Sequence, residues 1–508
     1  MFFYGDCRNI KSDHKSRDVG IVMSTGKKLI NGVLWTFTGT GVQVILQFLV
    51  FIVLSRLLEP ENFGVMSTAL ALITVLSTFS KLGIGPSIVQ REEIEIKHVQ
   101  TGFTVSLIFS TILTTIVWFA SPFISSFFNM PELGAVLQVL AFIHLIQGFS
   151  IIAEALLQRN LKFKKLAFVQ VISYLAYGIV GITLSLFGFG VWSLVFAQIT
   201  HVSLKTLLYL KVQPHSKRIV IEYDIAKELL VFGSGYSIGI INNHLALQGD
   251  TFVVGKFLGA SSLGIYSRAY QLLAMPVNLV GTVIEKVLFP SFSRIGNDIT
   301  KLQEVYKASI TVTAVICLPL SFFLMILSEN IILLLFGSMW TDAIVPFAIL
   351  ILALLPRVSY KISDSLTKSL GKVFQSANRQ FIYGVCVVLG VLIGQLYGLK
   401  GAAIGVVVAI TINYIFMAQI ALSLSSLTWK DFLIAHLPAL NLTIASVTPT
   451  YVVYFIIERL SLGNVITIFI SGSVFLSIIL ILIYYAPYFI FMKDRKVVLN
   501  IVEKMKKK

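Results

Sequence analysis

Residues 101–124 read TGFTVSLIFSTILTTIVWFASPFI, an apolar stretch that contains no Asp, Glu, Lys or Arg. A transmembrane helix needs about 20 mostly apolar residues, because each residue rises ~1.5 Å and the hydrocarbon core of a bilayer is ~30 Å thick. This stretch is therefore long enough to cross a membrane as a single helix.

Similar stretches recur along the whole chain, separated only by short polar connectors. We predict helices at 33–55, 64–84, 101–124, 133–156, 167–187, 189–210, 229–250, 263–288, 309–327, 341–358, 381–397, 399–424, 432–457 and 465–491. The pattern leaves no room for a soluble domain between them. The sequence therefore predicts an all-α polytopic membrane protein with about 14 transmembrane helices.

The composition agrees with a chain surrounded by lipid. Apolar residues make up 56% of the 508 residues, mean hydropathy is +0.87, and charged residues are only 13%, about half the usual share. The formal net charge of +16 is divided among short connectors, so we expect no nucleic-acid partner. Cys7, Cys317 and Cys386 form no CxxC pair or His/Cys cluster, and the sequence therefore predicts no disulfide framework, metal site or cofactor.

Lysine and arginine set the predicted orientation, because they mark cytoplasmic connectors of membrane proteins. With the N-terminus inside, 32 of the 40 Lys and Arg residues fall on the cytoplasmic side and five on the outer side. Both termini are then cytoplasmic. The predicted parts are a tail, two six-helix bundles, two further helices and a basic tail, at 1–28, 29–212, 213–424, 425–491 and 492–508.

The two bundles are predicted to be repeats of one another. Residues 54–64 read LSRLLEPENFG and residues 254–264 read VGKFLGASSLG, so that Arg56 matches Lys256 and Gly64 matches Gly264. Six helices per unit is an even number, which gives both copies the same orientation. The pattern indicates parallel repeats about an axis normal to the membrane.

Two predicted helices carry a polar stripe at spacings of 4, 3 and 4, which places each stripe on one helical face. The stripes are Thr36, Thr40, Gln43 and Gln47 in the first helix, and Gly239, Asn243, Ala246 and Asp250 in the seventh, with Gln248 nearby. Amides facing lipid would lose their hydrogen bonds with water, so the stripes must face other helices or water. Interhelical hydrogen bonding explains a single residue equally well, but the two stripes together favour a hydrophilic cavity.

Three basic residues, Arg56, Lys256 and Arg268, fall at the predicted outer mouth near Asp250. They could bind phosphate or anchor helices at the interface, and the sequence leaves both roles open. The candidate cavity residues are therefore Arg56, Gln43, Gln47, Asn243, Asp250, Lys256 and Arg268.

Several glycines are spaced for close helix contact, and the sequence lacks the common catalytic motifs. Small residues four apart allow close helix contact, which we expect at Gly390, Gly394, Gly398, Gly401 and Gly405. We find no P-loop, GxGxxG, HExxH or nucleophile elbow, and no catalytic residues are predicted. The protein is not expected to be an enzyme.

The stretch 249–295, GDTFVVGKFLGASSLGIYSRAYQLLAMPVNLVGTVIEKVLFPSFSRI, resembles Wzx-like polysaccharide flippases of the multidrug/oligosaccharidyl-lipid/polysaccharide exporter superfamily. The matching positions are Asp250, Gly255-Lys256, Leu258-Gly259, Leu263-Gly264, Tyr266, Arg268-Ala269, Pro276 and Pro290, together with Ser55-Arg56-Leu57-Leu58 and Phe63-Gly64.

The resemblance implies two six-helix bundles in a V shape, a central cationic cavity and alternating access. The implied cargo is an isoprenyl-pyrophosphate-linked oligosaccharide for lipopolysaccharide or exopolysaccharide synthesis, and the implied location is a bacterial inner (plasma) membrane. Few basic residues fall in predicted mid-span, so a strongly cationic lumen is not expected. The implied partners are the lipid-linked glycan, membrane lipids and a polysaccharide polymerase. Asp250 could couple a proton or sodium ion, or be structural.

Two other functions stay open. A multidrug or peptidoglycan-precursor exporter belongs to the same superfamily. A membrane glycan polymerase or glycosyltransferase belongs to another class, and the sequence has no large external loop with paired carboxylates to support it.

Overall fold

The computed structural model describes residues 41–81, 83–296, 298–460 and 462–485. Every regular element in these ranges is a helix, and none of the described residues forms a strand. The predicted tails 1–28 and 492–508, and the ends of the first and last predicted helices, lie outside the described residues.

The chain divides into two compact units that are discontinuous in sequence. The first unit contains described residues 41–54, 76–121 and 135–238, and the second contains 55–75, 122–134 and 239–485. Two short segments from the first third of the chain therefore pack within the second unit. The predicted bundle boundaries at 29–212, 213–424 and 425–491 stay predictions.

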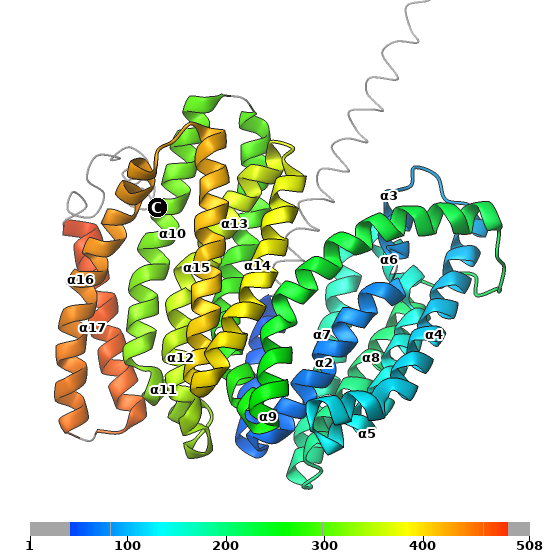
Figure 1. Ribbon diagram of the computed structural model, residues 1–508, viewed down its shortest axis with the longest axis horizontal. Helices are drawn as coiled ribbons and strands as arrows, with labels where there is room; N and C mark the ends of the chain where they lie inside the picture. Colours follow the sequence, from blue (N-terminus) through cyan, green and yellow to red (C-terminus); the bar gives the residue numbers. More distant parts are fainter. Residues whose placement is uncertain (1–40, 82, 297, 461, 486–508) are drawn as a thin grey trace, which may run out of the picture. The chain divides into compact units, whose positions relative to one another are not determined.

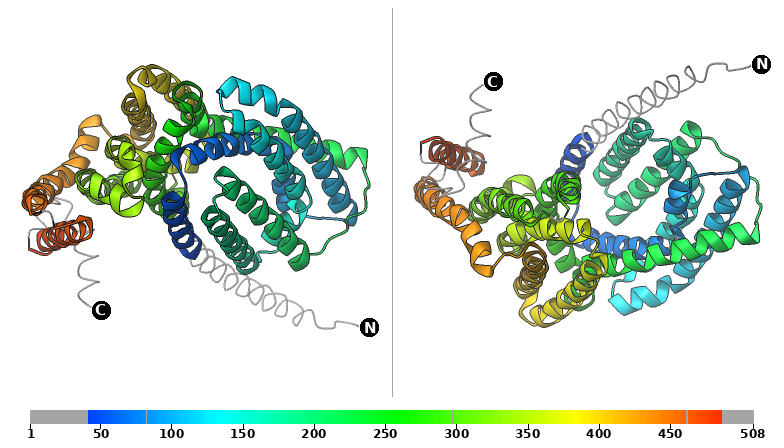
Figure 2. Two further views of the ribbon diagram at one scale, coloured as in Figure 1. Left: turned by 90° about the horizontal axis from the view of Figure 1, so that it is seen from below. Right: turned by 90° about the horizontal axis from the view of Figure 1, so that it is seen from above.

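The helices of the N-terminal half are Gly41–Leu57, α2 Pro60–Lys81, α3 Ile84–Gln90, α4 Ile96–Phe128, α5 Pro131–Gly148, α6 Ile151–Arg159, α7 Phe163–Leu186, α8 Val191–Val212 and α9 Tyr223–Ile295 (Figure 1). Within the first unit α7 lies beside α8 and α3 packs on α6 (Figure 2). Arg159 of α6 donates to carbonyl oxygens at the end of α3, at 3.3 Å from both Ile88 and Val89. These bonds satisfy carbonyl groups that a helix end leaves without partners.

The second unit adds α10 Ile299–Ile326, α11 Ser328–Leu335, η1 Ser338–Ala343, α12 Ile344–Leu350, η2 Ile351–Ala353, α13 Leu354–Ser369, α14 Val373–Gly394, η3 Gln395–Tyr397, α15 Gly398–Ser425, α16 Trp429–Arg459 and α17 Asn464–Tyr485. Helix α10 packs against α13 and α16, and α17 packs against α16 (Figure 1).

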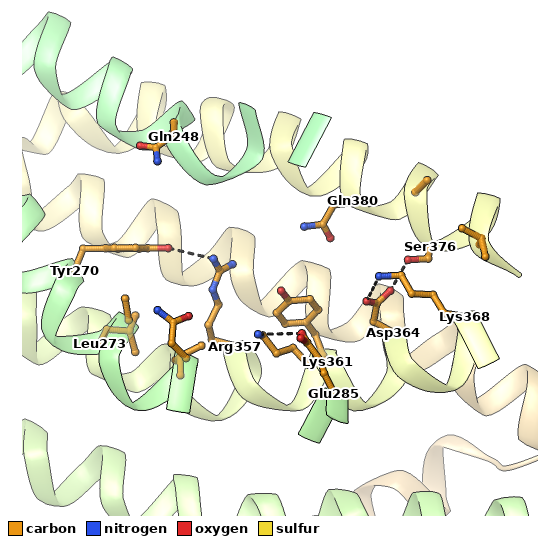
Figure 3. Close-up of a pocket in the computed structure, with 16 residues that line it drawn as sticks. Gln248, Tyr270, Leu273, Glu285, Arg357, Lys361, Asp364, Lys368, Ser376 and Gln380 are labelled. Carbon is orange, nitrogen blue, oxygen red and sulfur yellow. Dashed lines mark hydrogen bonds and ion pairs between the residues drawn. The ribbon is translucent and has the colours of Figure 1, made fainter. Parts of the chain in front are cut away.

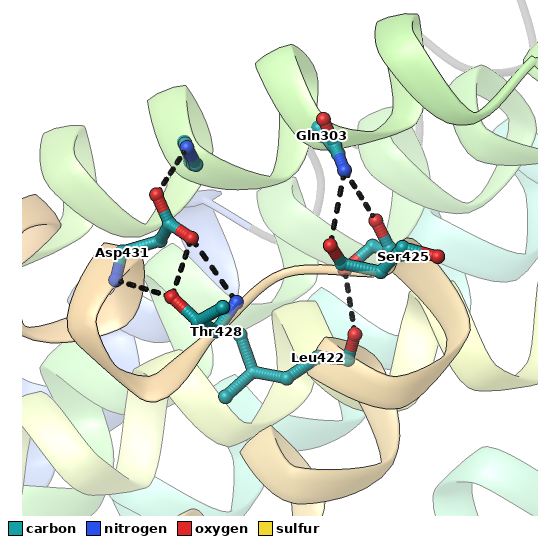
Figure 4. Close-up of polar contacts among 7 residues, drawn as sticks. Gln303, Leu422, Ser425, Thr428 and Asp431 are labelled. Carbon is teal, nitrogen blue, oxygen red and sulfur yellow. Dashed lines mark hydrogen bonds and ion pairs between the residues drawn. The ribbon is translucent and has the colours of Figure 1, made fainter.

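Helix α10 also holds the connection between α15 and α16 (Figure 4). Gln303 donates to the carbonyl oxygens of Ser425 at 2.9 Å and Ser426 at 3.2 Å. Thr428 and Asp431 form a capping box at the start of α16, and Lys307 pairs with Asp431 at 2.8 Å. These contacts fix α16 to the rest of the second unit.

Ten segments of the described chain are long and apolar enough to cross a membrane. Three of them hold more than one helix. The segment 373–425 contains α14 and α15, the segment 338–369 contains α12 and α13 with two short 3-10 helices, and the segment 248–295 is interrupted at Gly259. The polytopic all-helical fold is confirmed. The count of 14 and the cytoplasmic termini stay predictions.

Several predicted boundaries were wrong, and two of these errors concern the residues discussed below. The predicted connector 251–262 is helical in α9 except at Gly259, whose φ of 85° and ψ of 176° separate two helices. One glycine suffices there because it adopts positive φ without a Cβ clash. The helix predicted to end at residue 358 continues through α13 to Ser369, because its polar residues occupy one face rather than a loop.

The two repeated hairpins pack against each other within the second unit. A Cβ atom on Gly64 would lie 1.8 Å from the carbonyl oxygen of Ala260, and one on Gly264 would lie 1.7 Å from that of Pro60. Gly64 and Gly264 are equivalent positions of the two hairpins, 200 residues apart, and so are Pro60 and Ala260. Each glycine therefore contacts the same position of the other hairpin. This reciprocity supports the predicted internal repeat.

Close backbone contact also joins α14 and α15, as predicted for four of the five glycines. The prediction was wrong for Gly398, where φ is 70° and a Cβ atom would meet nothing within 4 Å. A Cβ atom on Gly394 would lie 2.2 Å from the carbonyl oxygen of Gly401, and one on Gly405 would lie 2.2 Å from that of Gly390. The helices can approach this closely only because these positions lack side chains.

Candidate functional site

Helix α13 places four charged residues on one face. Arg357, Lys361, Asp364 and Lys368 are spaced by 4, 3 and 4 residues, so they line up along the helix. The opposite face is apolar, and Val358, Ile362 and Leu366 are fully buried in the core. The amphipathic pattern thus turns a row of charges away from the apolar core.

This charged row forms one wall of a pocket in the second unit, with a volume of about 630 Å³ (Figure 3). Helices α9, α13 and α14 supply its lining. The lining residues are Gln248, Tyr270, Leu273, Ala274, Val277, Asn278, Glu285, Arg357, Tyr360, Lys361, Asp364, Lys368, Val373, Ser376, Ala377 and Gln380. Three basic and two acidic side chains leave one excess positive charge.

Arg357 is the most deeply buried cation of the pocket, at 7% exposure. Its guanidinium donates to the hydroxyl of Tyr383 at 2.6 Å and to the hydroxyl of Tyr270 at 3.2 Å. No carboxylate of the described residues lies within 4.0 Å of it. Two neutral hydroxyls orient the group, and the buried Asp250 interacts with its charge through space without forming an ion pair. These two bonds leave several of its five N–H donors for a ligand.

The two lysines, in contrast, are each paired with a carboxylate. Lys361 reaches Glu285 of α9 at 3.1 Å, and Lys368 reaches Asp364 at 2.6 Å. Ser376 of α14 also donates to Asp364. Figure 3 shows these charged groups in a row that extends from Arg357 toward Lys368.

Asp250 lies behind the pocket wall rather than in it. Its carboxylate accepts from the hydroxyl of Tyr266 at 2.6 Å and from the backbone N–H of Thr251 at 2.8 Å. The ring of Tyr266 lies beside that of Tyr270, with centroids 6.0 Å apart. Asp250 is therefore joined to the pocket through two tyrosines.

Arg56 and Lys256 occupy equivalent places at the ends of other helices. Arg56 donates to the carbonyl oxygens of Leu335, at 2.9 Å, and Leu334 at the end of α11. Lys256 donates to the carbonyl oxygen of Phe127 near the end of α4. A cation at a helix C-terminus satisfies free carbonyls and the helix dipole, and this accounts for both residues.

The other sequence candidates are dispersed. Arg268 lies over the ring of Phe63, 4.1 Å from its centroid. Gln43 and Gln47 are half-buried on helix Gly41–Leu57 in the first unit. Asn243 lies in α9, but its side chain is outside the described residues. None of the six candidates whose side chains are described lines the pocket, and the place of all seven in a transport cavity stays a prediction.

Arg357, Lys361 and Lys368 were not among the candidates predicted from sequence, because their polar stretch was interpreted as a cytoplasmic connector. The sequence nevertheless contains a pattern that identifies them. Together with Asp364 they have the same 4, 3, 4 spacing as the two polar stripes. The expectation of few basic residues in mid-span stays a prediction, although α13 is part of the candidate span 338–369.

The described residues are all helical, with ten candidate membrane spans and a pocket lined by three basic and two acidic side chains, and together these features define a multi-pass membrane transporter. Comparison with known proteins then gives the family. Residues 53–345, more than half of the chain, match the family described as "Polysaccharide biosynthesis protein". The protein belongs to this family.

Its relatives include the lipopolysaccharide biosynthesis protein WzxC of Escherichia coli, 27% identical over 77% of this chain and 80% of WzxC. The teichuronic acid biosynthesis protein TuaB of Bacillus subtilis is 24% identical over 73% of this chain and 78% of TuaB. The fold is similar to that of the lipid II flippase MurJ, with a TM-score of 0.72, 17% identity, and coverage of 89% of this chain and 99% of MurJ. The resemblance to Wzx-like flippases is confirmed, and the protein is a multi-pass inner-membrane protein.

Proposed function

We propose that the protein flips a lipid-linked oligosaccharide, carried on an isoprenyl pyrophosphate, across the inner membrane for surface polysaccharide synthesis. The observation that carries the proposal is Arg357, a buried guanidinium that faces the pocket with no carboxylate partner among the described residues. A planar guanidinium with free donors binds phosphate oxygens in pairs. The names of WzxC and of the probable glycan biosynthesis flippase Agl15 of Haloferax volcanii support the proposal.

The pocket suits the polar head of such a lipid. Its volume of about 630 Å³ lies within the range of ~300–1,000 Å³ of small-molecule sites. We infer that it holds the pyrophosphate and the first sugars, not a whole oligosaccharide. Tyr270 and Tyr360 line the same pocket, and their rings offer apolar faces against which a sugar can pack.

The physical need for the protein is the cost of desolvation. A pyrophosphate and its sugars would lose their hydration in hydrocarbon, whereas the apolar isoprenyl tail is soluble there. A polar pocket that opens to each side in turn would carry the head while the tail stays in lipid. Two six-helix bundles, fourteen spans and cytoplasmic termini fit this scheme and are part of the proposal, as is a polysaccharide polymerase that receives the product.

The charge of the pocket separates this function from export of cationic drugs. One excess positive charge and an unpaired arginine repel cations and attract anions. The likeness to MurJ leaves peptidoglycan-precursor export as the second candidate, because that cargo is also an anionic lipid.

A deletion strain tests the proposal and separates these candidates. We expect the strain to lose surface polysaccharide, to keep a normal cell wall, and to recover polysaccharide with the wild-type gene. Loss of the cell wall with surface polysaccharide intact would favour the peptidoglycan precursor instead. Normal amounts of both would contradict the proposal.

A further inference from the structure

The two lysines of the pocket are each paired with a carboxylate. An anion that binds one of these lysines must therefore compete with that carboxylate. The ion pair between Lys361 and Glu285 bridges α13 and α9, with 3.1 Å between Nζ and Oε1. The lysine side chain is 15% exposed and the glutamate side chain 53% exposed. The lysine is therefore fixed in the pocket wall, while its partner lies partly open to water.

Gly281 shows why the lysine can reach this partner. A Cβ atom at Gly281 would lie 2.6 Å from Nζ of Lys361 and 2.7 Å from its Cδ. The lysine side chain therefore lies flat across α9 at a position that has no side chain. Glu285 follows Gly281 by four residues, so it stands one turn further along the same face and meets the ammonium group.

We propose that Glu285 is an internal competitor for the anionic head group: it occupies Lys361 in the empty pocket, and a bound pyrophosphate displaces it. Arg357 then supplies the first contact of the pyrophosphate and Lys361 the second, four residues along the same face of α13. This inference rests on the proposed function and adds the residue that tunes affinity. A transporter must release its cargo, and a carboxylate that reclaims the lysine weakens binding for that purpose.

Asp364 does not have the same role. It lies on the same helix as its lysine partner, Lys368, at an i, i+4 spacing, and it also accepts from Ser376. Its carboxylate is thus fixed by two partners, whereas Glu285 is held by Lys361 alone among the side chains that the structure describes. The half-exposed glutamate is the partner that can swing away at small cost.

The test compares Glu285→Gln with Glu228→Gln in the full-length protein. Glu228 pairs with Arg91 in the first unit with similar exposures, 23% for the arginine and 58% for the glutamate side chain. Both variants remove one negative charge from a half-exposed ion pair. Only one of them lies in the pocket, so the comparison separates local competition from a change in net charge.

Binding of inorganic pyrophosphate to the purified protein is measured by isothermal titration calorimetry. We expect Glu285→Gln to tighten binding about two- to fivefold, the worth of a partly exposed ion pair, and Glu228→Gln to leave it unchanged. In a Lys361→Gln background, Glu285→Gln should have no further effect. Equal affinities for both glutamate variants, or tightening that persists without Lys361, would overturn the inference.

The same titration keeps this inference apart from the proposed function. If wild-type protein binds pyrophosphate, Arg357→Gln weakens that binding and Glu285→Gln changes nothing, then only the competition is wrong. If neither the wild type nor Glu285→Gln binds pyrophosphate or farnesyl pyrophosphate, both proposals fail together. Thermal unfolding of each variant confirms that it is folded.

Discussion

Arg357 is the residue on which the chemistry of the pocket depends. Its guanidinium is held by two hydroxyls from different helices, Tyr270 on α9 and Tyr383 on α14. A lysine at this position would keep the charge but could not fork between both tyrosines and a ligand, because ammonium is a point charge. A lysine substitution therefore tests the geometry of the guanidinium separately from its charge.

We predict that Arg357→Lys weakens pyrophosphate binding about tenfold, the loss of one charge-assisted hydrogen bond. Tyr270→Phe should have a smaller effect, since it removes one orienting contact at 3.2 Å and no charge. Titration with inorganic pyrophosphate gives both values. Wild-type affinity in the lysine variant would show that charge alone, and not the arginine fork, determines binding.

At the scale of elements, α13 shows what hydropathy can and cannot reveal. An average over the segment is low because charged and apolar faces cancel, so the prediction ended the helix at residue 358. The structure separates the faces, with Val358 and Ile362 buried and Arg357 and Lys361 in the pocket. Periodicity of 3.6 residues carries this information, and a window average does not.

The repeated hairpins offer a second prediction at this scale. Gly64→Ala or Gly264→Ala should destabilise the protein, because the new methyl group would meet a backbone carbonyl under 2 Å away and backbone cannot move aside. The cost of such overpacking is typically ~1–3 kcal/mol, visible as a lower midpoint of thermal unfolding. The control is Gly472→Ala in α17, where the nearest atom of Phe323 would be 3.8 Å away. A midpoint for either hairpin variant equal to that of the control would contradict the close contact.

For the whole molecule, the helices could be predicted from sequence and the pocket could not. Long apolar runs predicted where the helices lie, and the glycine pattern predicted the α14–α15 contact. The orientation inferred from lysine and arginine stays a prediction. The pocket depends on side chains that meet across the fold, such as Glu285 with Lys361, 76 positions apart. The first helical stripe and Asn243 were singled out by polarity alone, and polarity does not tell a cavity from an interhelical hydrogen bond.

The most direct measurement of the central claim is transfer of a lipid-linked oligosaccharide across a reconstituted bilayer. Proteoliposomes would carry isoprenyl-pyrophosphate oligosaccharide in both leaflets, and an added glycosidase would cleave the outer pool only. We predict that wild-type protein exposes the inner pool to the enzyme and that Arg357→Gln protein, folded and equally reconstituted, does so at least tenfold more slowly. An inner pool that stays protected with wild-type protein, or equal rates for the two proteins, would contradict the account.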